Sequence, residues 1–273
     1  MLYRTFLLLP GVDEKTERHL WQAGCRTWWH LLARDSLPRL SGRRLRLLQD
    51  RLCELIPSAK DLDTLAARLP RRHHWRLFKH FRREAVFLDI ETDGLRRGEH
   101  EVTVLGLATQ EGYFAYVAGE NLEEGLQRLK EARFWITFGG SFFDWPFLKS
   151  RYPWLSEPLV HLDLCPLFKR LGLKGGLKKI EKALGLGRPE EVDGFDGYMA
   201  VKLWRLWRRR GDAAALERLI TYNREDVMNL IPLAEILYSG LTMLALTGKI
   251  PALSVSSRED RRRRACDGQN KPI

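Results

Sequence analysis

The pattern of apolar and polar positions divides the chain into a helical first part and a longer part that mixes strands and helices. Helical spacing in the first part predicts helices over residues 14–23, from Thr27 onward, and over 42–55. Asp13 is a suitable cap for the first of these, and Gly24 is placed to end it. After residue 84, apolar runs predict strands over 86–90, 102–109, 113–118, 134–138 and 159–164, and a helix over 121–132 capped by Asn121.

These elements predict an α/β protein with a small all-α N-terminal domain. We expect four segments, which are a helical domain (1–57), a basic connecting segment (58–83), an α/β domain (84–245) and a basic, disordered tail (246–273). In the α/β domain, three antiparallel strands are followed by helix, strand, helix and strand. This succession predicts a mixed five-stranded sheet flanked by helices.

Basic residues gather outside the α/β domain, and their distribution says more than the net charge of +11. Residues 1–84 carry 18 Lys and Arg against 9 Asp and Glu, and residues 251–273 carry 6 against 3. The block between them is near neutral, with 22 against 23. Such basic flanks suit a protein that holds a polyanion and presents it to an acidic metal site. The alternative is a basic surface that is only solvated.

The composition favours a cytoplasmic protein. The four cysteines form no C-x-x-C pair, as expected of reduced thiols. No uninterrupted apolar run approaches the ~18 residues that a membrane span needs. Residues 6–9 are too short for the core of a signal peptide. We therefore expect no membrane partner.

Four acids and one tyrosine carry the chemistry that the sequence suggests. Asp89 and Glu91 lie two apart on an apolar strand, so they project from one face. Asp144 opens a helix after a strand, and Tyr222 and Asp226 lie one turn apart on an amphipathic helix. Converging carboxylates repel one another unless a cation lies between them, and oxygen ligands suit Mg²⁺ or Mn²⁺. The plainer alternatives are strand-end acids, a helix cap at Asp144, and a buried tyrosine bonded to a surface Asp226.

Several other polar positions are candidates for the surroundings of this site. The glycines Gly139 and Gly140 allow the backbone to approach a ligand, and His161 and Asp163 project from one face of a strand. Glycines and lysines around the start of a predicted helix form either a phosphate site or a loop with solvated lysines, at Lys174, Gly175, Gly176, Lys178 and Lys179. Arg71 and Arg72 begin a stretch in which basic residues alternate with Trp75, Phe78 and Phe81. These aromatic rings either stack on bases or dock on the main domain.

The motifs bear two resemblances. F-L-D-I-E-T (87–92), F-G-G-S-F-F-D-W-P-F-L (138–148) and Y-x-x-x-D (222–226) resemble the three motifs of DEDDy 3′–5′ exonucleases of the RNase H-like superfamily. H-L-D-L (161–164), G-G-L-K-K-I-E (175–181) and Y-N-R-E-D-V-M-N-L (222–230) are similar to the YprB-like RNase H-fold family. In addition, the helix–glycine–helix over 14–32, preceded by L-P-G-V, resembles helix-hairpin-helix modules, which grip nucleic acid through backbone N–H groups near Gly11. The alternative for this last segment is a helical cap on the larger domain.

The resemblance implies an RNase H-like fold and a nuclease that uses two Mg²⁺ or Mn²⁺ ions. Asp89, Glu91 and Asp226 would be direct metal ligands, Asp144 would act through coordinated water, and Tyr222 would orient the attacking water. His161 and Asp163 would lie just behind these groups. The expected reaction is 3′–5′ exonucleolytic hydrolysis of single-stranded DNA or unpaired 3′ ends. Open alternatives are a structure-selective endonuclease, an RNA exonuclease, and a nucleic-acid-binding adaptor with a silent site.

Overall fold

The computed structural model describes residues 1–192 and 194–253, and the predicted tail lies outside this range from residue 254 on. A five-stranded mixed sheet forms its centre, with the strand order β3-β2-β1-β4-β5. The strands are β1 (Ala85–Thr92), β2 (Val102–Thr109), β3 (Gly112–Val117), β4 (Phe134–Thr137) and β5 (Val160–Asp163). The first three pair antiparallel, whereas β4 and β5 join the sheet in parallel. This confirms the predicted sheet.

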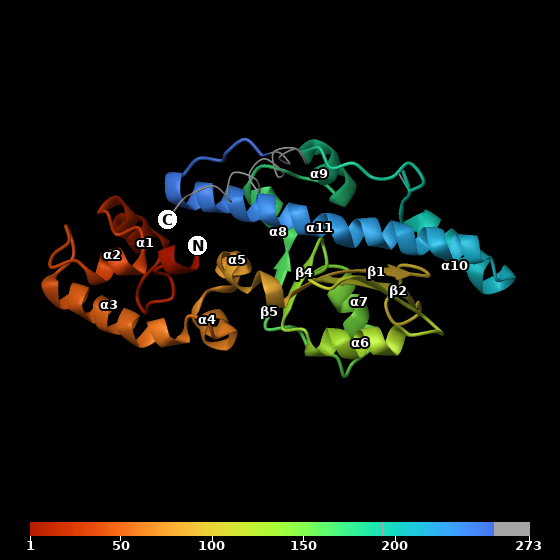
Figure 1. Cartoon of the computed structure of the whole chain (residues 1–273), viewed down its shortest axis with the longest axis horizontal. Coiled ribbons are helices and arrows are strands. Elements are labelled where there is room, and N and C mark those ends of the chain that lie inside the picture. Colours follow the sequence, from red (N-terminus) through yellow and green to blue (C-terminus); the bar gives the residue numbers. More distant parts are fainter. Residues whose placement is uncertain (193, 254–273) are drawn as a thin grey trace, which may run out of the picture.

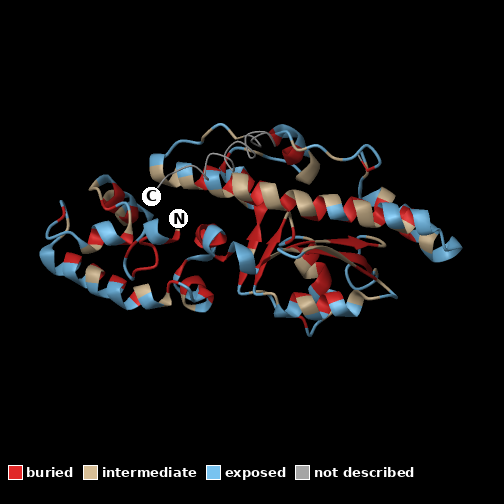
Figure 2. Cartoon of the chain, viewed as in Figure 1, coloured by how far each residue is buried: buried red, intermediate tan, exposed pale blue. Residues whose placement is uncertain are grey.

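Helices cover both faces of the sheet (Figure 1). On one face lie α6 (Leu122–Glu131) and α7 (Asp144–Arg151), whose apolar side chains share a core with alternate residues of β1 and β2. The other face is covered by the long helix α11 (Ala213–Thr247), together with α8 (Leu164–Arg170) and α9 (Leu177–Leu184). Helix α10 (Gly197–Arg210) packs beside α11. Strands β2 and β4 are buried almost throughout because they lie between these two layers, whereas the edge strand β3 is only partly buried (Figure 2).

Strand alternation decides which residues of β1 face which layer. Leu88 and Ile90 belong to the core beneath α6 and α7, whereas Phe87 belongs to the core shared with α11. Asp89 and Glu91 are spaced two and four residues from Phe87, so their side chains point toward α11. The acidic face of β1 is thereby turned to the helix that carries Asp226.

Helix α11 passes the length and composition test for a membrane span, with a mean hydropathy of 1.6 in an 18-residue window. The sequence expectation counted only uninterrupted apolar runs and therefore missed this window. In the structure the helix contacts α10 and three central strands, and its first half buries Asn223 and Asp226. One third of the residues in that window are buried, so packing accounts for part of its apolar character. The absence of a membrane partner stays a prediction.

The first 57 residues are mostly helical, as predicted, and residues 58–84 are mostly helical as well. They form η1 (Leu2–Arg4), α1 (Glu14–Gln22), α2 (Trp28–Leu32), α3 (Gly42–Leu55), η2 (Ile56–Ser58), α4 (Leu62–Arg68), η3 (Arg71–Leu77), α5 (Phe78–Phe81) and η4 (Arg82–Glu84). Asp13 and Thr27 cap α1 and α2 through their side chains, as expected. The apolar side chains of these helices are continuous with the core under α11.

One expectation about local structure is wrong, and one pair of open alternatives is decided. Asn121 does not cap α6, because its side chain instead accepts from Val117 N at 2.7 Å. The aromatic residues of the connecting segment do not stack on bases, since Trp75, Phe78 and Phe81 are at most 2% exposed. They dock in the core, which was the alternative interpretation of this stretch. Arg76, from the same stretch, forms a buried ion pair with Glu17 of α1.

Candidate metal centre

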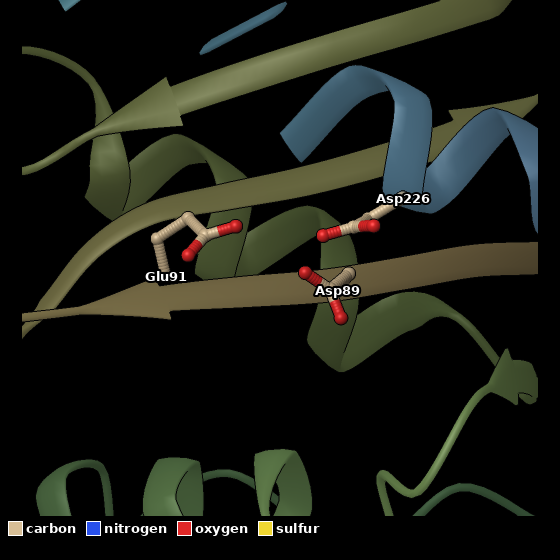
Figure 3. A group of neighbouring side chains, drawn as sticks. All are labelled: Asp89, Glu91 and Asp226. Atoms are coloured by element: carbon tan, nitrogen blue, oxygen red, sulfur yellow. The ribbon is translucent and has the colours of Figure 1, made fainter. Parts of the chain in front are cut away.

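Asp89 and Glu91 of β1 meet Asp226 of α11 between the strand and the helix (Figure 3). One carboxylate oxygen from each residue lies within 4.8 Å of the others. Glu91 and Asp226 are buried. Burial raises the pKa of all three carboxyl groups, and repulsion from neighbouring acids raises those of Asp89 and Glu91 further. Three converging carboxylates in a buried place fit a divalent cation, which would favour their ionised forms.

Asp144 lies close to this cluster but outside its three members. It is buried at the first turn of α7, and its Oδ1 accepts a hydrogen bond from Ile90 N of β1 at 3.1 Å. The structure gives it no capping bond to α7, so the helix-cap alternative is wrong. Burial raises the pKa of Asp144 to about 7, and the charge of Asp144 in turn raises the pKa of Asp89.

Tyr222 lies one turn before Asp226 on α11 and is also buried. Burial and the charge of Asp226 raise the pKa of its phenol far above the ordinary value. The Lys178 ammonium stands over the ring, 4.8 Å from its centre. Tyr222 therefore stays a neutral hydroxyl at physiological pH, beside the carboxylate cluster.

The residue that sequence reasoning missed at the centre of the cluster is Asn223. Its amide nitrogen donates to Asp89 Oδ2 at 3.2 Å, to the Asp89 carbonyl at 3.3 Å and to Glu91 Oε1 at 3.5 Å. The amide oxygen of Asn223 accepts from the Tyr113 hydroxyl at 2.9 Å. Asn223 lies three residues before Asp226, so helical spacing could have indicated that it shares the same side of α11.

Gly106 of β2 explains how α11 comes so close to the sheet. It is the register partner of Asp89 on the neighbouring strand. A Cβ atom at Gly106 would lie 1.9 Å from Asn223 Oδ1 and 2.9 Å from a Val227 methyl group. The absence of a side chain at this position therefore makes room for Asn223 against β1 and β2.

Asp163 organises the loop before α7. Its Oδ1 accepts from Gly139 N at 2.7 Å and from Cys165 N at 3.0 Å, and its Oδ2 accepts from Ser141 N at 3.1 Å. His161, from the same strand, is hydrogen-bonded to Thr137 Oγ1 at 2.9 Å. Both residues thus support the segment that leads to Asp144, which is the neighbourhood in which the sequence placed them.

The glycines of this loop have local reasons. Gly139 has a φ of +79°, which favours glycine. A Cβ atom at Gly140 would lie 2.4 Å from Thr137 Oγ1. The loop is therefore shaped by backbone geometry as well as by Asp163.

The remaining candidates are distributed unevenly. Gly175 and Gly176 precede α9, where Lys178 reaches Tyr222, while Lys174 lies before this helix and Lys179 lies in its first turn. Three other candidates contact residues outside the cluster. Arg71 pairs with Glu157 at 3.5 Å, Arg72 pairs with Glu14 at 3.1 Å, and the Gly11 carbonyl accepts from Arg44 at 2.9 Å.

A second missed residue is Arg188, in the segment between α9 and α10. Its Nε and Nη2 donate to the two carboxylate oxygens of Glu181, each at 2.7 Å. The same Nη2 also pairs with Asp226 Oδ1. Arg188 lowers the pKa of Asp226, against the larger effect of burial. Besides the Lys178 ammonium over the Tyr222 ring, the candidate centre therefore contains a cation that pairs directly with one of its carboxylates.

The family model of the RNase_H superfamily matches residues 86–238, which is more than half of the 273 residues. The chain belongs to the RNase H superfamily. A search of curated proteins gives no match. The matched range covers the whole sheet and the part of α11 that carries Asp226. Members of the RNase H superfamily are in general hydrolytic nucleases, so a nuclease-type function and a nucleic-acid substrate follow. The acidic cluster is compatible with metal binding.

Proposed function

We propose that this protein is a divalent-metal-dependent 3′–5′ exonuclease of the DEDDy type that acts on single-stranded DNA or unpaired 3′ ends. The observation that carries the proposal is the convergence of Asp89, Glu91 and Asp226 within 4.8 Å, on two elements far apart in the sequence. The nearby positions of Asp144 and Tyr222 support the five-residue motif set. The four cysteines, which form no C-x-x-C pair, support a cytoplasmic location.

The carboxylates of Asp89, Glu91 and Asp226 would hold Mg²⁺ or Mn²⁺, with Asp144 contacting the metal site through water. Two bound ions would activate a water molecule and stabilise the oxygens that enter and leave the phosphate. Tyr222 keeps its proton because its pKa is raised, so it orients a water molecule by hydrogen bonding and does not act as a general base. Asn223 holds the Asp89 carboxylate in the orientation that this arrangement needs.

Basic groups support a polyanionic substrate. Lys178 lies beside the site, and Lys174, Gly175, Gly176 and Lys179 surround the start of α9. On the N-terminal domain, Arg43, Arg44, Arg46 and Arg51 lie on the exposed side of α3. We propose that this domain grips nucleic acid near Gly11 in the manner of a helix-hairpin-helix, and that Arg71 and Arg72 of the connecting segment also contact the nucleic acid. This grip would leave Gly139 and Gly140 free to approach the terminal nucleotide.

The experiment is a gel assay with 5′-labelled single-stranded DNA and RNA, each with a free or a blocked 3′ end, in Mn²⁺ and in EDTA. A metal-dependent ladder that shortens from the free 3′ end supports the exonuclease and identifies the preferred sugar. Discrete internal cuts on blocked substrates favour the endonuclease. Tight binding without cleavage, equal in Mn²⁺ and EDTA, supports the adaptor and overturns the proposal.

A further inference from the structure

The Arg188 guanidinium lies between two carboxylates that have different surroundings. Glu181, on α9, belongs to no metal cluster among the described residues, and Asn229 of α11 also donates to it at 3.0 Å. Asp226 is a member of the candidate metal cluster. The Arg188 side chain is 4% exposed, and that of Glu181 is 2% exposed. The arginine is therefore a buried cation anchored on one side and joined to the catalytic carboxylates on the other.

The two hydrogen bonds to Glu181 are enough to fix the position of the Arg188 guanidinium. Glu181 accepts from Nε and from Nη2 in the bidentate geometry that suits arginine. A buried arginine that served only to pair with Glu181 would have no need of Asp226. In addition, Nη1 of Arg188 is buried and has no hydrogen-bond partner within residues 1–192 and 194–253. Donor capacity is thus left over on the side of the guanidinium away from its anchor.

Metal binding changes what this arginine requires. A divalent cation on Asp89, Glu91 and Asp226 would compete with Arg188 for the Asp226 oxygen that now accepts from Nη2. When the contact with Asp226 is lost, Arg188 stays in place because Glu181 still binds it. Its freed N–H groups then need a new acceptor, since a buried cation with unpaired N–H groups is unfavourable. The anion that reaches a metal-loaded nuclease site is a phosphodiester, and guanidinium groups bind phosphate oxygens in the same two-donor geometry as carboxylates.

We propose that Arg188 is a substrate-binding residue, which exchanges its contact with Asp226 for a non-bridging oxygen of the phosphodiester when the metal site is filled. This inference rests on the proposed function, since it assumes that a phosphodiester is the substrate of the same site. Glu181 and Asn229 are then the groups that keep the arginine in place. The exchange links metal loading to substrate binding. A bound metal frees Arg188 for the phosphate, and a bound phosphate frees Asp226 for the metal.

A purely structural role for Arg188 leads to a different expectation. If the arginine only orients Asp226, its loss should weaken Mn²⁺ binding to the protein alone, by about 10- to 100-fold for a group that orients a ligand. If it binds phosphate, its loss should leave Mn²⁺ affinity unchanged or higher, because a positive charge beside the metal has been removed. The free protein therefore separates the two roles without any measurement of cleavage.

The test compares Arg188→Gln and Arg188→Lys with a matched control, Lys182→Gln, which removes an exposed charge from α9. Calorimetry gives the Mn²⁺ affinity of each protein. Fluorescence anisotropy with a labelled oligothymidylate carrying 3′-terminal phosphorothioate linkages gives substrate affinity in Mn²⁺ and in EDTA. The ratio of these two affinities is the metal-dependent gain. Single-turnover cleavage of an ordinary oligonucleotide is measured beside it.

We expect Lys182→Gln to behave as the wild type. Arg188→Gln should keep Mn²⁺ affinity and lose roughly 10- to 100-fold of the metal-dependent gain, the effect of a charged hydrogen bond. Arg188→Lys should fall between them, because it keeps the charge but loses the two-donor geometry. It also serves as the test if Arg188→Gln does not fold.

Three results would overturn the inference. The first is an Arg188→Gln variant whose substrate affinity rises from EDTA to Mn²⁺ by as much as that of the wild type. The second is a loss of Mn²⁺ binding in both Arg188 variants. The third is a wild type whose substrate affinity is the same in Mn²⁺ and in EDTA. The proposed nuclease activity is judged separately. A wild type that binds the oligonucleotide more tightly in Mn²⁺ but never cleaves would overturn the nuclease and leave the role of Arg188 intact.

Discussion

The side-chain amide of Asn223 donates a hydrogen bond to the Asp89 carboxylate at 3.2 Å and thereby joins α11 to the acidic face of β1. The Tyr113 hydroxyl fixes the orientation of that amide by donating to its oxygen. We expect Asn223→Ala to lower kcat/KM or metal affinity by about 10- to 100-fold, because groups that orient metal ligands have effects of this size. Steady-state kinetics and Mn²⁺ titration measure both. Unchanged values in both would show that the amide is dispensable.

Direct ligands should be more sensitive than the residues that orient them. Asp89→Asn and Asp226→Asn each remove a charge that the proposed metal site needs, so cleavage should fall below detection while circular dichroism stays that of the wild type. Glu225→Gln, which changes a neighbouring acid of the same helix outside the cluster, is the matched control. Cleavage by Asp226→Asn at the wild-type rate would show that the site has been assigned wrongly.

Gly106 should tolerate no side chain, because an added Cβ atom would lie 1.9 Å from Asn223 Oδ1. We expect Gly106→Ala to lower the free energy of unfolding by about 1–3 kcal/mol through overpacking, and to lower activity by displacing Asn223. Urea unfolding measures the first effect. Gly42→Ala is the control, since a Cβ atom there meets no atom within 4 Å and an alanine suits the start of α3. Equal stability of the two variants would contradict the close approach of α11 to the sheet.

The metal-free protein should become less stable as the pH rises from about 4 to 7. The folded state keeps a proton on Asp144, whose pKa is about 7, whereas the unfolded chain loses it near the ordinary value of 3.8. The folded state therefore binds more protons in this window, and the free energy of unfolding falls with increasing pH. Asp144→Asn removes the titrating group, so in EDTA at pH 8 we expect it to be more stable than the wild type by a few kcal/mol at most.

Divalent metal should reverse this dependence, because it favours ionised carboxylates and competes with protons. Thermal unfolding with and without saturating Mg²⁺ should show a large stabilisation at pH 8 and a small one at pH 5. The Asp144→Asn variant in EDTA is the reference for both. An equal effect of Mg²⁺ at the two pH values would indicate that the carboxylates are ionised without metal.

The buried pair of Arg76 and Glu17 should dominate the attachment of η3 to α1. Arg76 Nη1 donates to both Glu17 oxygens, at 2.9 and 2.8 Å, and both side chains are at most 3% exposed. Arg76→Met leaves a buried carboxylate without its partner, so we expect a loss of about 3–5 kcal/mol in the free energy of unfolding. Arg72→Met breaks an exposed pair with Glu14 and should change it by about 1 kcal/mol or less. Similar losses in the two variants would show that burial does not decide the strength of these pairs.

The sequence predicted the framework better than it predicted the contacts within it. The bounds of β2 and α3 agree with those expected, because each is a regular pattern closed by turn or capping residues. The spacing of Asp89 and Glu91 on one strand predicted that they project from the same face, and the structure brings both together with Asp226. Arg188 could not be found in this way, because it lies 38 residues before Asp226 and meets it only through tertiary packing. Trp75 was ambiguous for a related reason, since a short basic and aromatic segment does not indicate which side faces the core.

The position of Asp226 on α11 has a consequence for the chain while it is being made. Synthesis produces the whole sheet, with Asp89, Glu91 and Asp144, before the helix that supplies Asp226, Tyr222 and Asn223 emerges. A ribosome-bound or truncated chain that stops before α11 would hold its first acids without the last one. A nuclease of the proposed kind would therefore lack one of its acids until α11 has emerged and packed on the sheet.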